Sequence, residues 1–310
     1  MARPSRPEIE AFLAAKHDAP ISGLEPLRGG FWSSAFAYAL DGRELVLRLG
    51  SIREGFEADR DAMAYGSPEL PVPAVLEIGA AFGEAYAISE RHHGSFLEEL
   101  DPALAGVGGE CLTRLLVALR AVPDDSTGQG PSWRRWLLDG LIDDPSRRVS
   151  GWRKQLAEDS SLDRLFTACE IRIAAMVDSC PQRRDLVHGD LLHQNVLMTP
   201  DAKRITAVFS WKCSLRGDFL YDTAWCTFWG DSFHPGIGAA DLWGRMMAEP
   251  SSVGDPDALK NAAERHHCYE LQIGASHLAW HTWVGNHDDR QRVARHTAML
   301  LERGPRQLSG

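Results

Sequence analysis

The sequence predicts an α+β protein that is rich in strands near its N-terminus and mainly helical afterwards. Two observations carry this prediction. Strand-like runs at 36–40 and 44–49 flank an Asp-Gly pair, which is a strong hairpin signal. Apolar residues at helical spacing dominate the later part of the chain, as in the segment 162–177. We therefore expect two domains, residues 1–90 and residues 91–310.

Local signals place the individual elements. Ser5 precedes a short opening helix, and a glycine-containing turn at 28–34 precedes the first hairpin. A Pro-Val-Pro break at 71–73 ends the first helical stretch after the hairpin. In chain order we expect a helix over 7–13, strands within 24–49, a helix over 56–66, strands near 74–79 and 85–90, and one small group of strands at 186–187, 196–198 and 205–209.

The net charge of the 310-residue chain is −10, which excludes a nucleic-acid-binding function in our interpretation, because neutralising phosphates requires a basic face. An acidic protein attracts cationic small molecules instead, although the same charge also serves solubility. The composition, with 44% hydrophobic and 25% charged residues, is that of a globular protein.

The chain is expected to be cytoplasmic. Its N-terminus lacks the apolar core of a secretion signal, and no apolar run approaches the length that would span a membrane. None of its six cysteines forms a CxxC pair, so we expect reduced, mostly buried thiols. We also expect a monomer or a weak dimer.

The segment His188–Asn195 carries the main chemical signal. A strand leads into a loop with Asp190, and Asn195 follows at the start of another strand. Protein kinases use the same Asp-to-Asn spacing, in which the aspartate faces the acceptor hydroxyl and the asparagine turns back toward a metal. Four intervening residues allow both side chains to point into one cavity. The alternative is a turn with an incidental polar cluster.

This loop resembles the His-Gly-Asp-Leu-x-x-x-Asn signature of the aminoglycoside phosphotransferase family. Further segments look like the hygromycin B phosphotransferases of that family, in the same order: 46–49, 55–56, 59–60, 70–79, 204–208 and 217–218. The resemblance implies a protein-kinase-like bilobal fold. Residues 1–90 would be the nucleotide-binding lobe, and residues 91–310 the helical lobe with the catalytic loop and the acceptor site.

The resemblance implies roles for the central residues. Asp190 would orient the acceptor hydroxyl and take its proton late in the reaction. Asn195 would bind Mg²⁺, and Arg48 would occupy the place where kinases have a phosphate-pairing lysine. Asp59 is the first candidate for the acidic partner of Arg48, and Glu57 is the second. A solvated strand arginine and plain surface-helix carboxylates are the alternatives.

The resemblance also implies an ATP site around these residues. Gly29, Gly30, Ser33 and Ser34 lie in a turn that would cover the phosphates with backbone N–H groups. Glu90 and His92 occupy the expected hinge between the lobes, where backbone groups would meet adenine. An ordinary turn remains the alternative for the glycine pair.

One position departs from the family pattern. Members carry a metal-binding aspartate immediately before the tryptophan that is Trp211 here, and this chain has Ser210 instead. A neutral hydroxyl supplies less charge to Mg²⁺ than a carboxylate does, so we expect weakened catalysis. The family positions of Asp218 and Asp222 suggest that they brace the loop and do not replace the missing carboxylate.

The acceptor site is expected on the C-terminal helices, with Glu270, Asp288 and Asp289 as candidates for binding a cationic hydroxylated acceptor. Exposed helix-end charge is the alternative. His277 and His281 lie four residues apart and are interpreted as part of a packed or substrate-facing helix, with two metal ligands on one helix face as the alternative. Trp225 and Trp229 are interpreted as core residues, and His266-His267 as a solvated helix pair.

Three functions remain open on the sequence. The first is ATP-dependent phosphorylation of an aminoglycoside-like hydroxyl. The second is a kinase of another hydroxylated metabolite or antibiotic, such as a choline-like amine or a sugar. The third is an impaired, pseudokinase-like binding protein, for which Ser210 is the argument.

Overall fold

The structure is a computed structural model that describes residues 4–28, 30–124, 132–250, 255 and 257–307. The chain forms two compact units. Unit 1 comprises residues 1–98 and 190–214, and unit 2 comprises residues 99–189 and 215–310.

This partition differs from the division that the sequence suggested at residue 90. The short strand β6 (Ser95–Phe96) pairs with β8 (Val196–Met198), and β8 pairs in turn with β9 (Ile205–Val208). Backbone hydrogen bonds therefore attach the segment after residue 90 and the candidate catalytic loop to unit 1. A pairing between segments so distant in sequence leaves no local signal.

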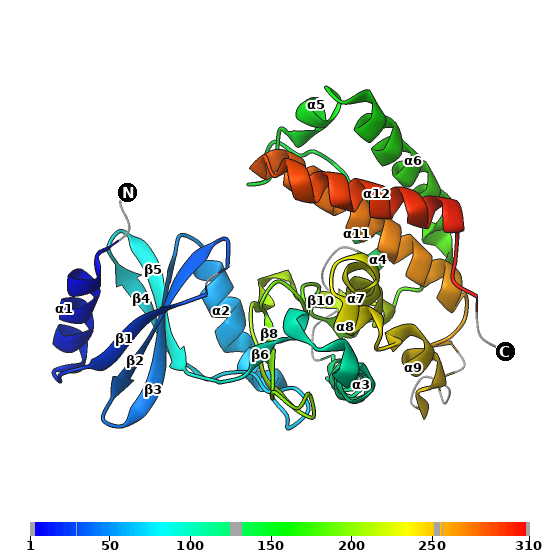
Figure 1. Cartoon of the computed structure of the whole chain (residues 1–310). Coiled ribbons are helices and arrows are strands. Elements are labelled where there is room, and N and C mark those ends of the chain that lie inside the picture. Colours follow the sequence, from blue (N-terminus) through cyan, green and yellow to red (C-terminus); the bar gives the residue numbers. More distant parts are fainter. Residues whose placement is uncertain (1–3, 29, 125–131, 251–254, 256, 308–310) are drawn as a thin grey trace. The chain divides into compact units, whose positions relative to one another are not determined.

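Unit 1 is built on a five-stranded antiparallel sheet (Figure 1). In spatial order its strands are β1 (Ser22–Leu27), β2 (Ser33–Leu40), β3 (Arg43–Gly50), β5 (Glu84–Glu90) and β4 (Val75–Ala81). Asp41 and Gly42 between β2 and β3 have φ values of 49° and 79°, and Leu40 pairs with Arg43. Two positive φ angles are what a two-residue type I′ turn requires. The predicted hairpin is therefore confirmed.

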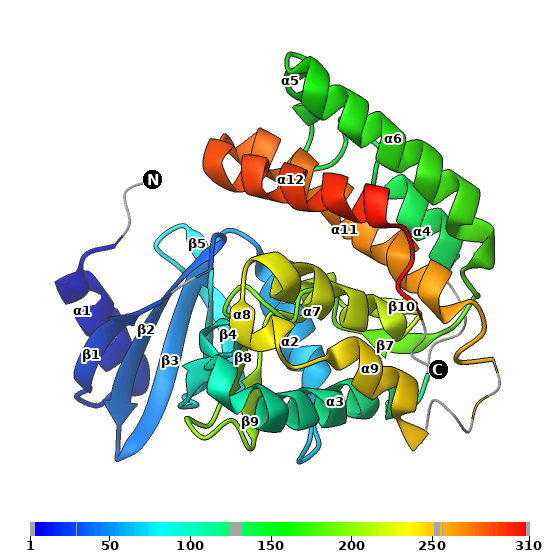
Figure 2. The same ribbon diagram turned by 45° about the vertical axis from the view of Figure 1, so that its right-hand side comes forward.

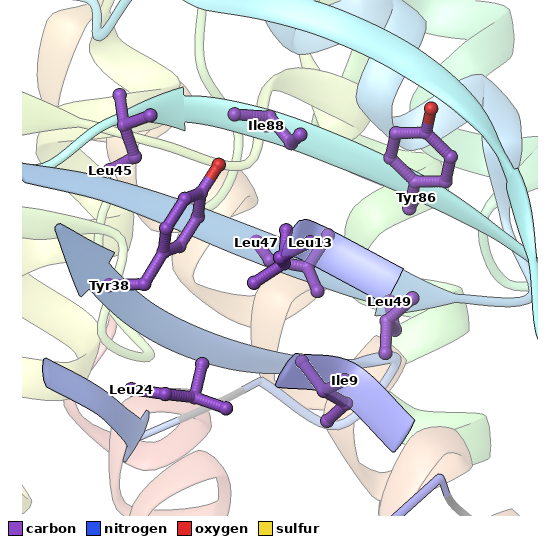
Figure 3. Packing of buried hydrophobic residues seen from close by; sticks show 9 residues of the cluster. All are labelled: Ile9, Leu13, Leu24, Tyr38, Leu45, Leu47, Leu49, Tyr86 and Ile88. Carbon is purple, nitrogen blue, oxygen red and sulfur yellow. The ribbon is translucent and has the colours of Figure 1, made fainter. Parts of the chain in front are cut away.

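Each face of this sheet is covered by one helix. Alternation along β3 sends successive side chains to opposite faces. On the face of α1 (Arg6–His17), one hydrophobic cluster contains Ile9, Leu13, Leu24, Tyr38, Leu45, Leu47, Leu49, Tyr86 and Ile88 (Figure 3). On the other face, Phe56 of α2 (Arg53–Asp61) packs with Val75 and Ala87. Burying the leucines of β3 against α1, at about 1.5–3 kcal/mol each, turns Arg48 toward α2.

The small group of strands predicted in the second half of the chain is in fact two separate sheets. β8 and β9 belong to the three-stranded sheet of unit 1, whereas β7 (Asp185–Val187) pairs with β10 (Leu215–Gly217) in unit 2. The short helices η1 (Ala62–Tyr65) and η5 (Trp211–Cys213) complete the parts of unit 1 that matter for the site.

Unit 2 is mainly helical and is organised around α11, a buried helix of 23 residues (Figure 2). α11 packs against α5, α6, α7 and α12, and α3 packs against α8 and α9. The described helices are α3 (Ala105–Ala121), α4 (Trp133–Asp139), α5 (Trp152–Leu156), α6 (Ser160–Met176), α7 (Leu220–Ser232), α8 (Pro235–Gly238), α9 (Leu242–Ala248), α11 (Ala262–Val284) and α12 (His287–Arg303), with short turns η2 (Leu97–Glu99), η3 (Pro102–Leu104) and η4 (Val177–Ser179).

One described helical stretch, residues 102–121, is long and apolar enough to span a membrane by length and composition. The sequence interpretation had excluded any run of that length. Half of this stretch is buried within the protein, where Leu112, Leu115 and Leu119 of α3 belong to the core. These features are those of a core helix. All six cysteines are free thiols, and only Cys213 is exposed among them.

Candidate active site

Arg48 and Asp59 form an ion pair on the α2 face of the unit 1 sheet. Arg48 Nη1 lies 2.5 Å from Asp59 Oδ2, and the guanidinium sits 5.0 Å from the centre of the Phe56 ring. The Asp59 side chain is 7% exposed. Glu57, the second candidate partner, instead bonds Arg53 at 2.9 Å on the surface of α2. The structure thus pairs Arg48 with the first candidate.

The same carboxylate also holds the segment that follows β9. Asp59 Oδ1 accepts the backbone N–H of Trp211 at 2.8 Å, so each of its two oxygens has a different partner. Phe209 N–H donates to the carbonyl of Asn195 at 2.8 Å. These two bonds fasten residues 209–211 to the helix on one side and to the candidate catalytic loop on the other.

Ser210 lies between these two fastened residues in the left-handed conformation, with φ 65° and ψ 55°. Aspartate and asparagine adopt this region more readily than other non-glycine residues do. The backbone here therefore has a conformation that aspartate adopts readily, while the side chain is a neutral hydroxyl. The residue before Ser210, Phe209, is joined through its backbone N–H to Asn195, the expected metal ligand.

The loop between Asp190 and Asn195 brings both side chains together. Asn195 Nδ2 donates to Asp190 Oδ2 at 2.9 Å and to the Asp190 carbonyl at 2.8 Å. Two groups that the sequence analysis did not single out complete the loop. His193 Nδ1 lies 2.7 Å from Asp190 Oδ1, and Glu98 accepts the N–H of Gln194 at 2.5 Å. Burial raises the pKa of Glu98.

Asp222 of α7 holds the residues immediately before Asp190. Its Oδ2 accepts the N–H of His188 at 2.7 Å, and its Oδ1 accepts the N–H of Gly189 at 2.8 Å. Gly189 has φ 75°, a conformation that glycine adopts without steric cost. The carboxylate thus fixes the direction in which the chain enters the catalytic loop, in keeping with the bracing role that the family resemblance implied.

Asp218 has a different task. It forms a fully buried two-pronged pair with Arg265, at 2.8 Å and 2.9 Å, and accepts the hydroxyl of Tyr269 at 2.6 Å. Trp133 Nε1 donates to the same hydroxyl at 3.0 Å. Asp218 therefore braces α11 and not the catalytic loop.

The candidate phosphate-covering turn is partly described. Gly29 lies outside the described residues, and a Cβ added at Gly30 would meet nothing within 4 Å. Ser33 and Ser34 begin β2, where Ser33 pairs with Gly50 of β3. Both serines therefore lie at the end of the hairpin that carries Arg48.

The candidate hinge follows β5. Glu90 donates its N–H to the carbonyl of Ala74 at 3.1 Å, and its side chain pairs with Arg43 at 3.2 Å near the surface. His92 Nδ1 lies 2.7 Å from the carbonyl of Thr206. Both side chains are thus used to hold the segment in place, which leaves any contact with adenine to backbone groups.

A small recess lies within unit 1 beside these elements, with about 10 Å³ of space that the centre of a water molecule can occupy. It is bounded by the Arg48–Asp59 ion pair, by Ser89 just before the hinge, and by residues 208–209 just before Ser210. Its lining residues are Arg48, Asp59, Val72, Pro73, Val75, Ser89, Val208, Phe209 and Trp211. Its walls combine apolar side chains with one charged pair.

Glu270, predicted as an acceptor-binding residue, has another role. It is fully buried, and its two oxygens bond Arg303 at 2.9 Å and Arg306 at 2.8 Å. Thr227 donates to it as well, at 3.1 Å. A carboxylate sequestered in this way secures the end of the chain to α11 and is not available to an acceptor. The sequence does not reveal this because both arginines are distant in the chain.

Asp288 and Asp289 begin α12. The side chain of Asn286 accepts the N–H of Asp289 and donates to its carboxylate at 2.8 Å, and Arg292 lies 3.4 Å from the same carboxylate. Negative charge in a first helical turn complements the helix dipole. Asn286 therefore caps the helix, the Asp289 carboxylate is used by Asn286 and Arg292, and Asp288 is exposed.

The aromatic and imidazole residues of unit 2 are mostly core residues. Trp225 and Trp229 are nearly buried, and the ring of His277 packs edge-on to both, with centroid distances of 5.2 Å and 4.8 Å. Within the described residues no group of three metal-binding side chains occurs. The expectation of a solvated His266-His267 pair is wrong, because both side chains are fully buried in α11.

The arrangement in unit 1 defines a class of protein. A charged residue on the third strand pairs with a helix carboxylate, and a loop aspartate is followed five residues later by an asparagine that bonds it. Protein-kinase-like phosphotransferases are built in this way.

The comparisons with known proteins agree with this class. Residues 23–250 match the model of the phosphotransferase enzyme family (APH), so the chain belongs to that family. It is 31% identical to hygromycin-B 4-O-kinase of Escherichia coli over 297 residues, which cover 91% of this chain and 81% of that protein.

Solved structures give the same result. The crystal structure of aminoglycoside phosphotransferase APH(4)-Ia superposes with a TM-score of 0.81 at 26% identity, covering 96% of this chain and 99% of the other. A thermostable mutant of that protein in ternary complex with AMP-PNP and hygromycin B has a TM-score of 0.80 at 26% identity, covering 95% and 98%. The predicted fold and family are confirmed.

Proposed function

We propose that this protein transfers the γ-phosphate of ATP to a hydroxyl group of a cationic, aminoglycoside-like acceptor. The observation that carries the proposal is the bonded pair of Asp190 and Asn195 at kinase spacing. A relative of similar length is a hygromycin-B kinase, and a similar structure binds AMP-PNP together with hygromycin B. Since such a reaction modifies an antibiotic, resistance is the physiological role that we propose.

Arg48 is suited to bind phosphate oxygens. Asp59 holds one of its terminal nitrogens, while its buried Nε has no hydrogen-bond partner among the described residues. An unsatisfied buried donor is costly, and an anionic phosphate oxygen would satisfy it. Gly30, Ser33 and Ser34 would cover the phosphates. Backbone groups near Glu90 and His92 would meet the adenine.

Two oxygen-bearing side chains, on segments joined by the Phe209–Asn195 backbone hydrogen bond, suit a magnesium ion. The amide oxygen of Asn195 and the hydroxyl of Ser210 would hold Mg²⁺, a cation that prefers oxygen ligands and retains several waters. When bound, the ion supplies positive charge that offsets the charge of the phosphates. Ser210 contributes no negative charge, so we propose a weakened metal site and slow turnover.

Asp190 would accept a hydrogen bond from the acceptor hydroxyl and take its proton late in the transfer. Its carboxylate is 22% exposed, so that a hydroxyl can reach it. Asp288 remains the candidate acidic contact for a cationic acceptor. We further propose a cytoplasmic protein that acts as a monomer or a weak dimer.

A second function has one observation in its favour, which is Ser210 itself. A pseudokinase-like protein would bind nucleotide without turnover, because the metal carboxylate is missing. The intact pair of Asp190 and Asn195 favours the enzyme.

A panel of acceptors tests the proposal. ADP release, coupled to an optical readout, would be measured with hygromycin B, other aminoglycosides, simple amines and neutral sugars at saturating ATP and Mg²⁺. We expect turnover that depends on an aminosugar acceptor. Turnover with neutral sugars alone would overturn the acceptor class, and nucleotide binding without any turnover would support the pseudokinase.

A further inference from the structure

The side chain of His193 is bonded to the candidate catalytic aspartate. Its Nδ1 lies 2.7 Å from Asp190 Oδ1, and the two side chains are 43% and 22% exposed. Asn195 Nδ2 donates to the other oxygen, Oδ2, at 2.9 Å. The Asp190 carboxylate is therefore held from both sides by groups within its own loop.

Chemistry fixes the direction of the bond to His193. An ionised carboxylate can only accept hydrogen bonds, so the imidazole must carry a proton on Nδ1. A charge-assisted bond of this length belongs to the stronger class of hydrogen bonds. His193 is thus a donor toward Asp190.

The backbone of the loop is shaped to make this contact. His193 and Gln194 are consecutive residues with positive φ, 64° and 67°. Such a conformation is costly for non-glycine residues and persists where the surroundings impose it, often at functional sites. The Gln194 N–H bond to Glu98 and the Phe209 N–H bond to Asn195 hold the loop on either side. The left-handed pair folds the imidazole back onto Asp190.

We propose that His193 is a positioning residue that orients the Asp190 carboxylate toward the acceptor hydroxyl. This rests on the proposed phosphotransfer. In phosphoryl transfer the proton moves late and catalysis depends mainly on positioning. A donor on Oδ1 stops rotation of the carboxylate, so that Oδ2 keeps its place beside Asn195. This role requires that His193 donates a hydrogen bond to Asp190, and it does not require the imidazole to change its charge during the reaction.

Three variants of His193 separate the loss of its hydrogen-bond donor from changes in side-chain size and from changes in the cost of the left-handed backbone. The side-chain nitrogen of His193→Asn occupies the place of Nδ1, and asparagine tolerates the left-handed backbone. The nitrogen of His193→Gln lies one bond further out and cannot reach Asp190 in the same way. His193→Gly removes the donor while relieving the backbone cost.

We expect His193→Gly and His193→Gln to lower kcat roughly tenfold, the size of a lost charge-assisted hydrogen bond. Their KM values for ATP and acceptor should stay within about twofold of wild type, and His193→Asn should recover most of the kcat. Thermal unfolding of His193→Gly should be no earlier than that of wild type. Unchanged kcat in the glycine variant, or an asparagine variant as slow as the glutamine variant, would overturn the proposal.

A readout independent of turnover accompanies these measurements. NMR of the ¹⁵N-labelled imidazole in the ligand-free protein should show the proton of His193 on Nδ1, and this preference should disappear in Asp190→Ala. A proton mainly on Nε2 in the wild type would refute the contact. If the wild type phosphorylated no acceptor, the proposed function would fail before any variant is compared, and the NMR result would still decide the contact.

Discussion

Substitution of Asp59 tests whether one carboxylate holds both Arg48 and the segment that follows β9. Asp59→Ala removes a side chain that is 7% exposed and that bonds both Arg48 and the Trp211 N–H. The substitution leaves a buried amide without its acceptor and a mostly buried guanidinium without its counter-charge. The first loss costs about 1–3 kcal/mol, and the second adds a similar amount after allowance for the 18% exposure of Arg48. We expect a total of about 2–6 kcal/mol.

The chain provides a matched control in the same helix. Glu57→Ala also removes a carboxylate that pairs with an arginine, but Glu57 and Arg53 are 36% and 49% exposed. Pairs of this kind contribute about 0.3–0.5 kcal/mol. Asp59→Asn should fall between the two, since its amide oxygen can still accept the Trp211 N–H.

Urea unfolding of the three variants measures the free energies, and hydrogen exchange of the peptide containing Trp211 localises the effect. We expect Asp59→Ala to lose protection at the Trp211 amide while Glu57→Ala keeps it. If Asp59→Ala were destabilised no more than Glu57→Ala, or if the Trp211 amide stayed protected, the described connection would be refuted.

Two further perturbations follow from the structure. Ser210→Asp should raise turnover, by tenfold for each roughly 1.4 kcal/mol of transition-state stabilisation that it recovers. Turnover should also depend more steeply on the Mg²⁺ concentration, because a carboxylate binds the ion more strongly than a hydroxyl does. Equal or lower turnover across a Mg²⁺ titration would contradict this. Burial lowers the pKa of His267 to about 4 and that of His266 well below its ordinary value. Unfolded histidines titrate near ~6.5, so the unfolded chain binds more protons below that pH. His267 alone should lower the free energy of unfolding by roughly 2 kcal/mol between pH 6.5 and about 4.5, and His266 should lower it further. The variant His267→Phe should lose the His267 share of this pH dependence, and urea titrations showing no such slope in the wild type would refute the buried neutral state.

The parts of this protein that could be predicted from sequence are those specified locally. The hairpin at Asp41-Gly42 needs only its two turn residues and the alternation of the flanking strands. The Asp190–Asn195 pair lies within one loop, so its spacing alone indicates that the side chains meet. His193 lies in the same loop, but nothing in the order of residues indicates its left-handed backbone or the direction of its ring.

Contacts between distant segments could not be predicted. Asp59 bonds an amide 152 residues away in the chain, and the strand pairs that attach the loop to unit 1 are two or three residues long. α11 gives a different reason. It is buried on all sides from Arg265 to Ala275, so no amphipathic stripe distinguishes buried polar residues from exposed ones. For this reason the sequence alone suggested that Glu270, His266 and His267 lie on the surface.

The central claim is that Asp190 directs an acceptor hydroxyl toward the phosphate of ATP. The most direct measurement is mass spectrometry of hygromycin B after incubation with ATP and Mg²⁺, with wild type compared to Asp190→Ala, and with nucleotide affinity determined for both. We expect a singly phosphorylated product with the wild type, none with the variant, and similar nucleotide affinities, because Asp190 serves the acceptor and not the adenine. Equal product from both proteins would contradict it.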